Sequence, residues 1–252
     1  MRRRNCCSGQ RVITRGNAAH KGGIRMHLSI VMPVLNEAAG IAQALRQLAP
    51  LRRRGAQLIV VDGGSSDATL AAAAPHADLL LRSGRGRALQ MNAGAAQAAG
   101  DVLLFLHADT GLPPDADALL AAALQQADWG RFDVQLAGNR RMLAVIATMM
   151  NLRSRLTGIA TGDQALFMRR STFEQAGGFA PIPLMEDIEL SRRLRRIGRP
   201  ACLRARVTSS GRRWEQHGVW RTIFLMWRLR LAYFLGADPH ALARAYGYRP
   251  PE

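Results

Sequence analysis

Polar residues follow four apolar runs of this sequence, at the points where the runs end. Carboxylate and amide oxygens in such places can bind a divalent cation or accept hydrogen bonds from a ligand. The polar positions are Asn36 and Glu37 after "LSIVMPV", Asp62 at the end of "AQLIVVD", the stretch "SGRGRALQMNAG" after "ADLLLR", and Asp109 after "DVLLFLH". Any one of them could instead cap a helix or form a turn. Polar residues at all four ends favour a shared ligand site.

The apolar runs indicate the fold that must position these residues. They are continuous rather than alternating, and Ala/Leu-rich helical stretches separate them. Continuous runs are typical of strands buried on both faces. We therefore expect an α/β fold with a mostly parallel sheet and helices on both faces. In such sheets ligands bind beyond the carboxyl ends of the strands, which is where the polar residues stand.

The net charge of +17 is unevenly distributed along the 252 residues. Residues 1–25 hold seven basic residues and no acid, and the other arginines are scattered. Aromatic residues make up only 6% of the chain, too few for an obvious base-stacking surface, which disfavours nucleic acid as a partner. We expect residues 1–25 to be a basic disordered leader, or the product of a mis-assigned start upstream of Met26.

Cysteine usage and hydropathy favour a cytoplasmic location. Cys6 and Cys7 lie in the leader and Cys202 stands alone in the body, so the sequence contains neither a disulfide framework nor a CxxC spacing. No apolar run reaches the roughly 18 residues of a membrane span. The fingerprints GxGxxG and GxSxG also fail, which argues against hydride transfer and serine-hydrolase chemistry.

Five segments, in this order and spacing, resemble family 2 glycosyltransferases with the GT-A fold. The segments are "IVMPVLNE", "VVDGGSSDAT", "GRGRALQMNAG", "LFLHAD" and "LMEDIELSRRL", and the resemblance spans about residues 28–217. It implies transfer of a sugar from a nucleotide diphosphate to an acceptor, usually with inversion at the sugar carbon. It also implies a GT-A domain at 26–218, followed by a helical extension at 219–252.

The resemblance implies a nucleotide site and a metal site. The nucleotide site would comprise Pro33, Asn36 and Glu37 as a cradle, Asp62 as an acceptor for a base N–H, and Arg85 and Asn92 beside the nucleotide or its phosphates. Asp109 would be the last residue of a DxD-like motif that holds Mn²⁺ or Mg²⁺ against the diphosphate. His107 stands where the motif usually has Asp. Its imidazole could ligate Mn²⁺, orient Asp109, or do neither.

The acidic pair Glu186–Asp187 opens a predicted helix. "MED" resembles the TED motif of the family, in which the second acid is the general base, so Asp187 would take the acceptor proton. The alternative is that both acids only complement the helix dipole. Upstream, "TGDQALF" resembles the segment where acceptor and donor sugar meet. Asp163 and Gln164 are candidate contacts there, unless the segment is simply a turn that leads into a strand.

The segment "SGRRWEQHG" resembles the QxxRW motif of processive synthases. Ser210 replaces the glutamine, so we expect a single transfer rather than processive synthesis. Arg213 would contact the diphosphate, and His217 would reach phosphate or metal, unless both belong to an arginine-rich surface turn.

The helical extension carries an apolar stripe on one face of its first helix. Its members are Trp220, Phe224, Trp227, Leu231 and Phe234. Packing of this stripe on the core is the favoured interpretation. The competing one is a membrane-surface helix flanked by Arg221 and Arg228, which would make the cytoplasmic protein a peripheral membrane protein.

The sequence thus predicts a metal-dependent, inverting, non-processive glycosyltransferase with a small-molecule or lipid-linked acceptor. "FLHADT", "TGDQALF" and "RRWEQHGVWRT" look most like a small bacterial subgroup associated with arsenosugar biosynthesis. The rival hypothesis is an inactive GT-A scaffold that binds RNA or an anionic membrane.

Overall fold

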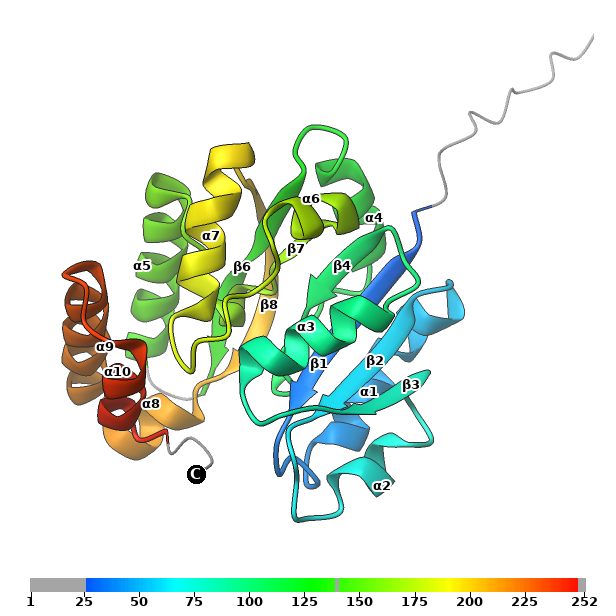
Figure 1. Cartoon of the computed structure of the whole chain (residues 1–252), viewed down its shortest axis with the longest axis horizontal. Helices are drawn as coiled ribbons and strands as arrows, with labels where there is room; N and C mark the ends of the chain where they lie inside the picture. Colours follow the sequence, from blue (N-terminus) through cyan, green and yellow to red (C-terminus); the bar gives the residue numbers. More distant parts are fainter. Residues whose placement is uncertain (1–25, 139–140, 249–252) are drawn as a thin grey trace, which may run out of the picture.

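The structure, a computed structural model, describes residues 26–138 and 141–248, apart from the side chains of Arg213 and His217. Residues 1–25, for which a basic leader is predicted, lie outside the described residues. Within them one eight-stranded sheet has the order β3-β2-β1-β4-β7-β6-β8-β5 (Figure 1). The strands are β1 (Leu28–Val34), β2 (Gln57–Asp62), β3 (Leu79–Arg82), β4 (Val102–Phe105), β5 (Thr110–Gly111), β6 (Trp129–Ala137), β7 (Phe167–Arg169) and β8 (Ala201–Ser210).

Helices cover both faces of the sheet and one of its ends (Figure 1). They are α1 (Ile41–Arg53), α2 (Thr69–Ala73), α3 (Arg87–Gln97), α4 (Ala116–Ala123), α5 (Arg141–Thr157), the 3₁₀ turn η1 (Gly162–Gln164), α6 (Arg170–Gln175), α7 (Glu186–Ile197), α8 (Arg212–His217), α9 (Val219–Phe234) and α10 (Pro239–Tyr246). The predicted α/β class is confirmed.

The sheet is mixed rather than uniformly parallel. Strands β3, β2, β1 and β4 run parallel to one another, whereas β7 runs antiparallel to both β4 and β6. The reversal follows from the connection, because η1 lies close to His107 beyond the carboxyl end of β4 and β7 begins only three residues later. The strand must therefore run back along the sheet.

The strand side chains divide between two apolar clusters, one on each face. On β1, Ile30 and Met32 join the cluster under α1, α4 and α5, whereas Val31 joins the cluster under α3, α6 and α7. All seven residues of β1 are buried, as its continuous apolar run predicts. The outer strand β3 departs from that expectation. Its residues are alternately half-buried and exposed, because an edge strand has one neighbour and less cover.

Helix α3 holds the carboxyl ends of strands β1 and β2. The buried Gln90 amide donates to the carbonyl oxygens of Val34 and Val61, both at 2.8 Å. Gly94 lets the helix approach β1 closely, because a Cβ there would lie 2.4 Å from Val31. These contacts hold the loops after β1 and β2 in place.

The C-terminal helices α8, α9 and α10 lie together at one end of the molecule (Figure 1). Leu229 of α9 and Leu242 of α10 share an apolar cluster with Ile159, Leu184 and Ile188. Helices α9 and α10 therefore pack against the segment before η1 and the start of α7. The domain boundary at residue 218 stays a prediction.

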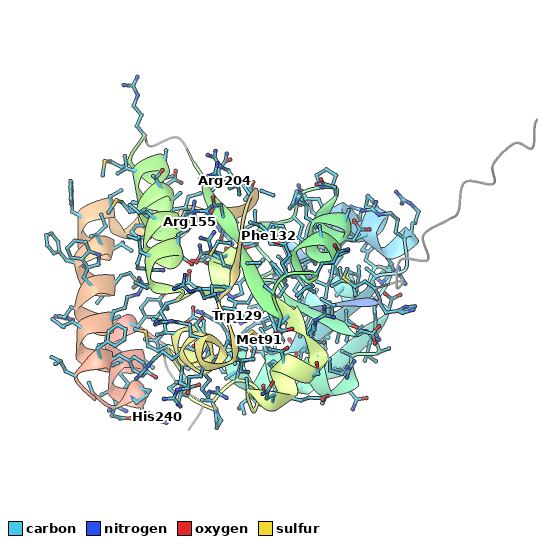
Figure 2. All side chains as sticks on the ribbon, turned by 90° about the horizontal axis from the view of Figure 1, so that it is seen from above. Met91, Trp129, Phe132, Arg155, Arg204 and His240 are labelled. Atoms are coloured by element: carbon cyan, nitrogen blue, oxygen red, sulfur yellow. The ribbon has the colours of Figure 1, made fainter. Side chains whose placement is uncertain are left out.

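The apolar stripe of α9 faces solvent, so the expectation that it packs on the core is wrong. Its five side chains are between 58% and 66% exposed, and Figure 2 shows side chains standing out from the outer side of this helix. The face that α9 buries instead carries Val219, Thr222 and Leu229. Among the described helices, none has the length and apolar character needed to cross a bilayer.

Candidate active site

A cavity of about 450 Å³ lies between the carboxyl edge of the sheet, the start of α7 and the C-terminal helices. Sequence analysis proposed five of the residues that line it, from three different motifs. They are His107, Asp109, Asp163, Glu186 and Asp187. Their meeting in one cavity is what the strand-end pattern and the acidic pair predict together.

The acidic pair is presented to this cavity by a constrained turn. Met185, directly before it, has φ +70°, a left-handed conformation that costs free energy for a residue other than glycine. The Asp187 carboxylate accepts hydrogen bonds from the N–H of Gly162 at 2.9 Å and of Ile188 at 2.7 Å. Glu186 is buried, and its carboxylate lies 3.6 Å from the Arg87 guanidinium. Both acids are thus held in place rather than free at a helix end.

Burial raises the pKa of both carboxyls in the pair. For Glu186 the nearby Arg87 opposes this effect, and for Asp187 the two backbone N–H donors oppose it. A carboxylate whose pKa is raised is a better proton acceptor than one whose pKa is at its ordinary value. The environment therefore suits Asp187 to the role of general base.

His107 contacts η1. Its Nδ1 lies 3.6 Å from an Asp163 carboxylate oxygen, and its ring packs on Gly162, where a Cβ would come within 2.6 Å. The imidazole therefore lies against the segment whose backbone holds Asp187.

Asp109 stands in the loop after β4 with 36% of its side chain exposed. The Arg212 guanidinium approaches its carboxylate only to 4.0 Å, and the Thr110 hydroxyl donates to it at 3.5 Å. Both contacts are long, so a ligand could replace them. Burial raises the pKa of Glu37, Arg212 opposes this effect, and the charge of Asp109 raises the pKa further. Glu37 and Asp109 therefore lie in one electrostatic neighbourhood.

The donor set at Asp109 fits Mg²⁺ or Mn²⁺ bound together with a diphosphate. In the described residues, no three His, Cys, Asp or Glu side chains gather closely enough to hold a metal by themselves. Mg²⁺ commonly takes one or two protein carboxylates and completes its shell with phosphate oxygens and water. One accessible carboxylate at the edge of a cavity is consistent with that arrangement. His217, also proposed as a ligand, has its side chain outside the described part.

The loops after β1 and β2 are tied to each other. Buried Asp62 accepts hydrogen bonds from the N–H groups of Gly64 and Ser65, both at 3.1 Å, and from the Ser65 hydroxyl. Asn36, at φ +54°, accepts from the Ser66 N–H at 2.9 Å. A base N–H would have to replace one of the bonds to Asp62, so its contact with a nucleotide stays a prediction. Pro33 is buried within β1, opposite Val61.

Two other predicted nucleotide residues make contacts within the protein. The Asn92 side-chain amide donates to the carbonyl of Phe179 at 2.8 Å and accepts its N–H at 2.9 Å, which fastens α3 to the segment before α7. The Arg85 guanidinium lies 5.6 Å from the Tyr248 ring, within the range of a cation–π contact. Neither residue lines the cavity. Their nucleotide-binding roles stay predictions.

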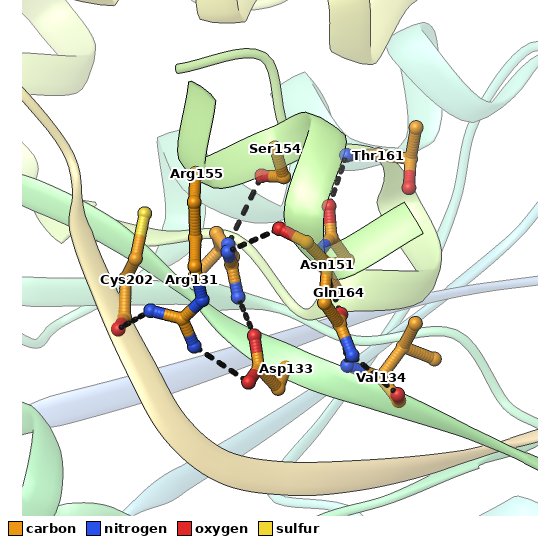
Figure 3. Close-up of polar contacts among 9 residues, drawn as sticks. All are labelled: Arg131, Asp133, Val134, Asn151, Ser154, Arg155, Thr161, Gln164 and Cys202. Carbon is orange, nitrogen blue, oxygen red and sulfur yellow. Dashed lines mark hydrogen bonds and ion pairs between the residues drawn. The ribbon is translucent and has the colours of Figure 1, made fainter. Parts of the chain in front are cut away.

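Gln164 supports the site from behind through a buried polar network (Figure 3). Its side chain accepts the Thr161 N–H at 3.2 Å and donates to Asn151 at 3.3 Å. Asn151 in turn bonds both backbone groups of Val134 on β6. Next to it, fully buried Arg131 bonds Ser154 and Asp133. The network joins β6 and α5 to η1 and so fixes the Gly162 amide that holds Asp187.

Sequence reasoning missed Arg87 and Arg212, which both line the cavity. Arg212 stands beside the proposed Arg213 in "GRRW", and the sequence alone does not fix the phase of α8. The side chain of Arg213 is outside the described part. Arg87 lies in the recognised stretch "GRGRALQ", but its partner Glu186 lies 99 residues further along the chain.

Comparison with known proteins decides the family. Residues 29–174 match the family described as Glycosyl transferase family 2. The chain belongs to this family, as predicted. The undecaprenyl-phosphate 4-deoxy-4-formamido-L-arabinose transferase of Pseudomonas fluorescens (strain Pf0-1) is 31% identical over 159 residues, which are 56% of this chain and 46% of that protein. The family 2 chain thus spans about half the length of the curated relatives it matches.

Solved structures show the same fold at low sequence identity. TarS 1-349 of S. aureus in complex with UDP has a TM-score of 0.60 at 19% identity, covering 73% of this chain and 60% of that one. Glucosyl-3-phosphoglycerate synthase of Mycobacterium tuberculosis, with Mn²⁺ and UDP, has a TM-score of 0.55 at 22% identity. This match covers 73% of this chain and 71% of that one. Mannosyltransferase PcManGT of Pyrobaculum calidifontis, with GDP-Man and Mn²⁺, has a TM-score of 0.59 at 20% identity. This match covers 88% of this chain and 69% of that one. The GT-A assignment of this family 2 chain is therefore confirmed.

Proposed function

We propose that the protein transfers a glycosyl group once, with inversion, from a nucleotide diphosphate to an acceptor oxygen. The observation that carries this proposal is the cavity that holds Asp187 and Asp109 together, one fixed by backbone donors and one accessible. The named structural neighbours bind UDP or GDP-Man, which supports a nucleotide-sugar donor. Ser210 at the glutamine position of QxxRW supports a single transfer.

Different residues of the cavity act on the leaving group and on the acceptor. Mg²⁺ or Mn²⁺ bound by Asp109 and the diphosphate would neutralise charge on the leaving group. Arg212 and Arg87 add positive charge to the same cavity. Asp187 takes the proton of the acceptor oxygen as this oxygen bonds to the sugar carbon. The nucleotide diphosphate departs with the electrons of the broken C–O bond.

A thermal-shift panel tests the donor and the metal. UDP, GDP, CDP, dTDP and ADP are each added with Mg²⁺, Mn²⁺ or EDTA. At a hundredfold excess over Kd, binding should stabilise the protein by about 2.7 kcal/mol, or roughly 5–10 °C. We expect a pyrimidine or guanine nucleotide to give the largest shift and EDTA to abolish it, because Asp62 accepts from an N–H that adenine does not present in the same place.

The same panel separates this function from the rival one. Stabilisation by ADP alone would contradict the role of Asp62 in base recognition. An inactive scaffold would show no shift with any nucleotide diphosphate and Mn²⁺, together with RNA affinity that falls steeply with salt.

The acceptor is a small molecule or a lipid-linked group. Curated relatives are named as undecaprenyl-phosphate transferases, which supports the lipid-linked alternative. A role in arsenosugar biosynthesis stays a prediction from the sequence resemblance, and no residue of the cavity is specific for arsenic.

We further propose that α9 docks a cytoplasmic protein on an anionic membrane. Five large apolar side chains along this helix are exposed, and the exposed arginines Arg221 and Arg228 flank them. An amphipathic helix of this composition gains free energy by burying its apolar face at the lipid headgroup boundary. Arginines beside it add attraction to anionic lipid, which salt weakens.

Co-sedimentation with vesicles tests this docking. Full-length protein should pellet with vesicles of phosphatidylglycerol and phosphatidylcholine, and less with phosphatidylcholine alone. Phe224→Glu combined with Leu231→Glu should abolish pelleting, because both side chains are more than 60% exposed on the stripe. Leu89→Glu on α3, which is 43% exposed, is the matched control. Equal pelleting of all variants would remove the membrane interpretation.

A further inference from the structure

A second cavity, of about 520 Å³, lies between α5 and α9 and is mostly apolar. Met142, Val145 and Met149 line it from α5, and Trp220, Ile223 and Trp227 line it from α9. We call this cavity the α5–α9 groove. An exposed apolar concavity of this kind is typical of a site for an apolar ligand.

The α5–α9 groove adjoins the candidate active site. The two cavities share Asp163, Thr161, Trp214, Met226 and Arg230 in their walls. The polar end of a ligand in the groove would therefore lie next to the cavity that Asp187 lines. This adjacency favours a substrate over a protein partner, because only a substrate has to extend into the reaction cavity.

The groove ends at Arg153, a half-buried arginine with two buried guanidinium nitrogens that have no hydrogen-bond partner among the described residues. In the described part of the chain, the guanidinium atoms Nε and Nη2 of Arg153 have no hydrogen-bond partner, and neither does the hydroxyl of Thr161. Burial lowers the pKa of Arg153, while the negative charges of Asp187 and Asp163 oppose this effect. Buried guanidinium N–H groups without an acceptor are costly unless an anion binds to them. Arginine donors in a planar fork match phosphate oxygens well.

We propose that the acceptor is a lipid phosphate, whose hydrocarbon chain lies in the α5–α9 groove and whose phosphate binds Arg153 and Thr161. This inference rests on the proposed glycosyl transfer and names the acceptor class. Trp220 and Trp227 belong both to the groove wall and to the exposed stripe of α9. The groove therefore opens where the membrane surface would lie, so a lipid can enter it sideways.

The transfer balances with such an acceptor. The bond between the sugar carbon and the nucleotide diphosphate breaks, and its electrons leave with the nucleotide. A bond forms between that carbon and an oxygen of the lipid phosphate. If the phosphate is a monoanion its proton passes to Asp187, and if it is a dianion no proton has to move. The second pKa of a phosphate monoester is about 6, so both forms are present near neutral pH.

A titration with three probes tests the site. Farnesyl phosphate, below its micelle concentration, is compared with farnesol and with inorganic phosphate by calorimetry on the full-length protein. Farnesyl phosphate should bind at least about tenfold more tightly than either of the others, because it alone supplies both chain and anion. Equal affinity for farnesol would overturn the role of Arg153, and equal affinity for inorganic phosphate would overturn the role of the groove.

Two variants and one control refine the titration. Arg153→Gln and Met149→Glu should each weaken the binding of farnesyl phosphate by about tenfold or more. Leu156→Glu, on the same helix, 78% exposed and outside the groove, should change affinity by less than about twofold. Unchanged binding in Met149→Glu would refute the role of the groove in holding the hydrocarbon chain, even if Arg153→Gln fails to fold.

A parallel measurement separates this inference from the proposed function. The thermal shift with UDP or GDP and Mn²⁺ is recorded for every variant. A normal nucleotide shift without binding of farnesyl phosphate refutes the lipid phosphate acceptor and leaves the transferase standing. Binding of farnesyl phosphate without any nucleotide shift supports the groove and refutes the transferase.

Discussion

Asp187→Asn is expected to lower turnover by about 10²–10⁴-fold, the usual contribution of a general base. The side chain keeps its size, and its carbonyl oxygen can still accept the N–H of Gly162. What it loses is the ability to take a proton as the acceptor oxygen bonds to the sugar. Affinity for donor and metal should therefore stay nearly intact, because the proton moves only in the transition state.

Steady-state kinetics over a range of pH, with nucleotide Kd values measured separately, checks this prediction. Glu186→Gln is the matched control and should cost less turnover, because Glu186 faces Arg87. With a lipid phosphate acceptor, the loss in Asp187→Asn should shrink above about pH 6, where the phosphate dianion brings no proton. Near-normal turnover at every pH, or a loss explained wholly by weaker nucleotide binding, would reduce the acidic pair to a helix-dipole role.

Asp109→Asn is expected to abolish metal-dependent nucleotide binding while the protein stays folded. Loss of a residue one step removed from a metal already costs about 10–100-fold in affinity, and removal of a direct carboxylate ligand should cost at least that much. Stability should change little, because Asp109 is partly exposed and its ion pair with Arg212 is long.

Calorimetry with UDP or GDP, with and without Mn²⁺, combined with a thermal melt, measures both effects. His107→Asp is the informative companion, because it restores the second acid of the usual motif and should tighten Mn²⁺ binding if position 107 faces the ion. If Asp109→Asn unfolds the protein while Mn²⁺ still promotes binding in the folded fraction, Asp109 has a structural role.

The sheet and the positions of its chemistry were predictable because burial on both faces leaves a clear pattern. The predicted strand at 28–34 has the same bounds as β1, and α7 begins at Glu186 as expected. The carboxyl-edge rule then placed Asp109 correctly beside the cavity. Each of these inferences depends on local sequence and on one general property of parallel sheets.

The remaining features depend on contacts that no local pattern records. The spacing of Trp220 and Phe224 identifies one face of α9, but not whether that face meets core or solvent. Gln164 and Asn92 have the polar character of ligand-binding residues. The Asn151 side chain nevertheless takes up the amide of Gln164, and the backbone of Phe179, 87 residues away in the chain, takes up that of Asn92. Arg87 reaches the site only because α3 and α7 pack on the same face of the sheet.

The polar network behind η1 has a consequence for how the protein loses its activity on heating. Gln164 is bonded to Asn151, and Asn151 to β6, so η1 cannot detach alone without breaking partly buried hydrogen bonds. Local opening of this segment thus has a free energy close to that of separating α5 from the sheet. The geometry around Asp187 and the global fold should then melt in a single cooperative transition, with no window of temperature in which a folded protein holds a disordered base.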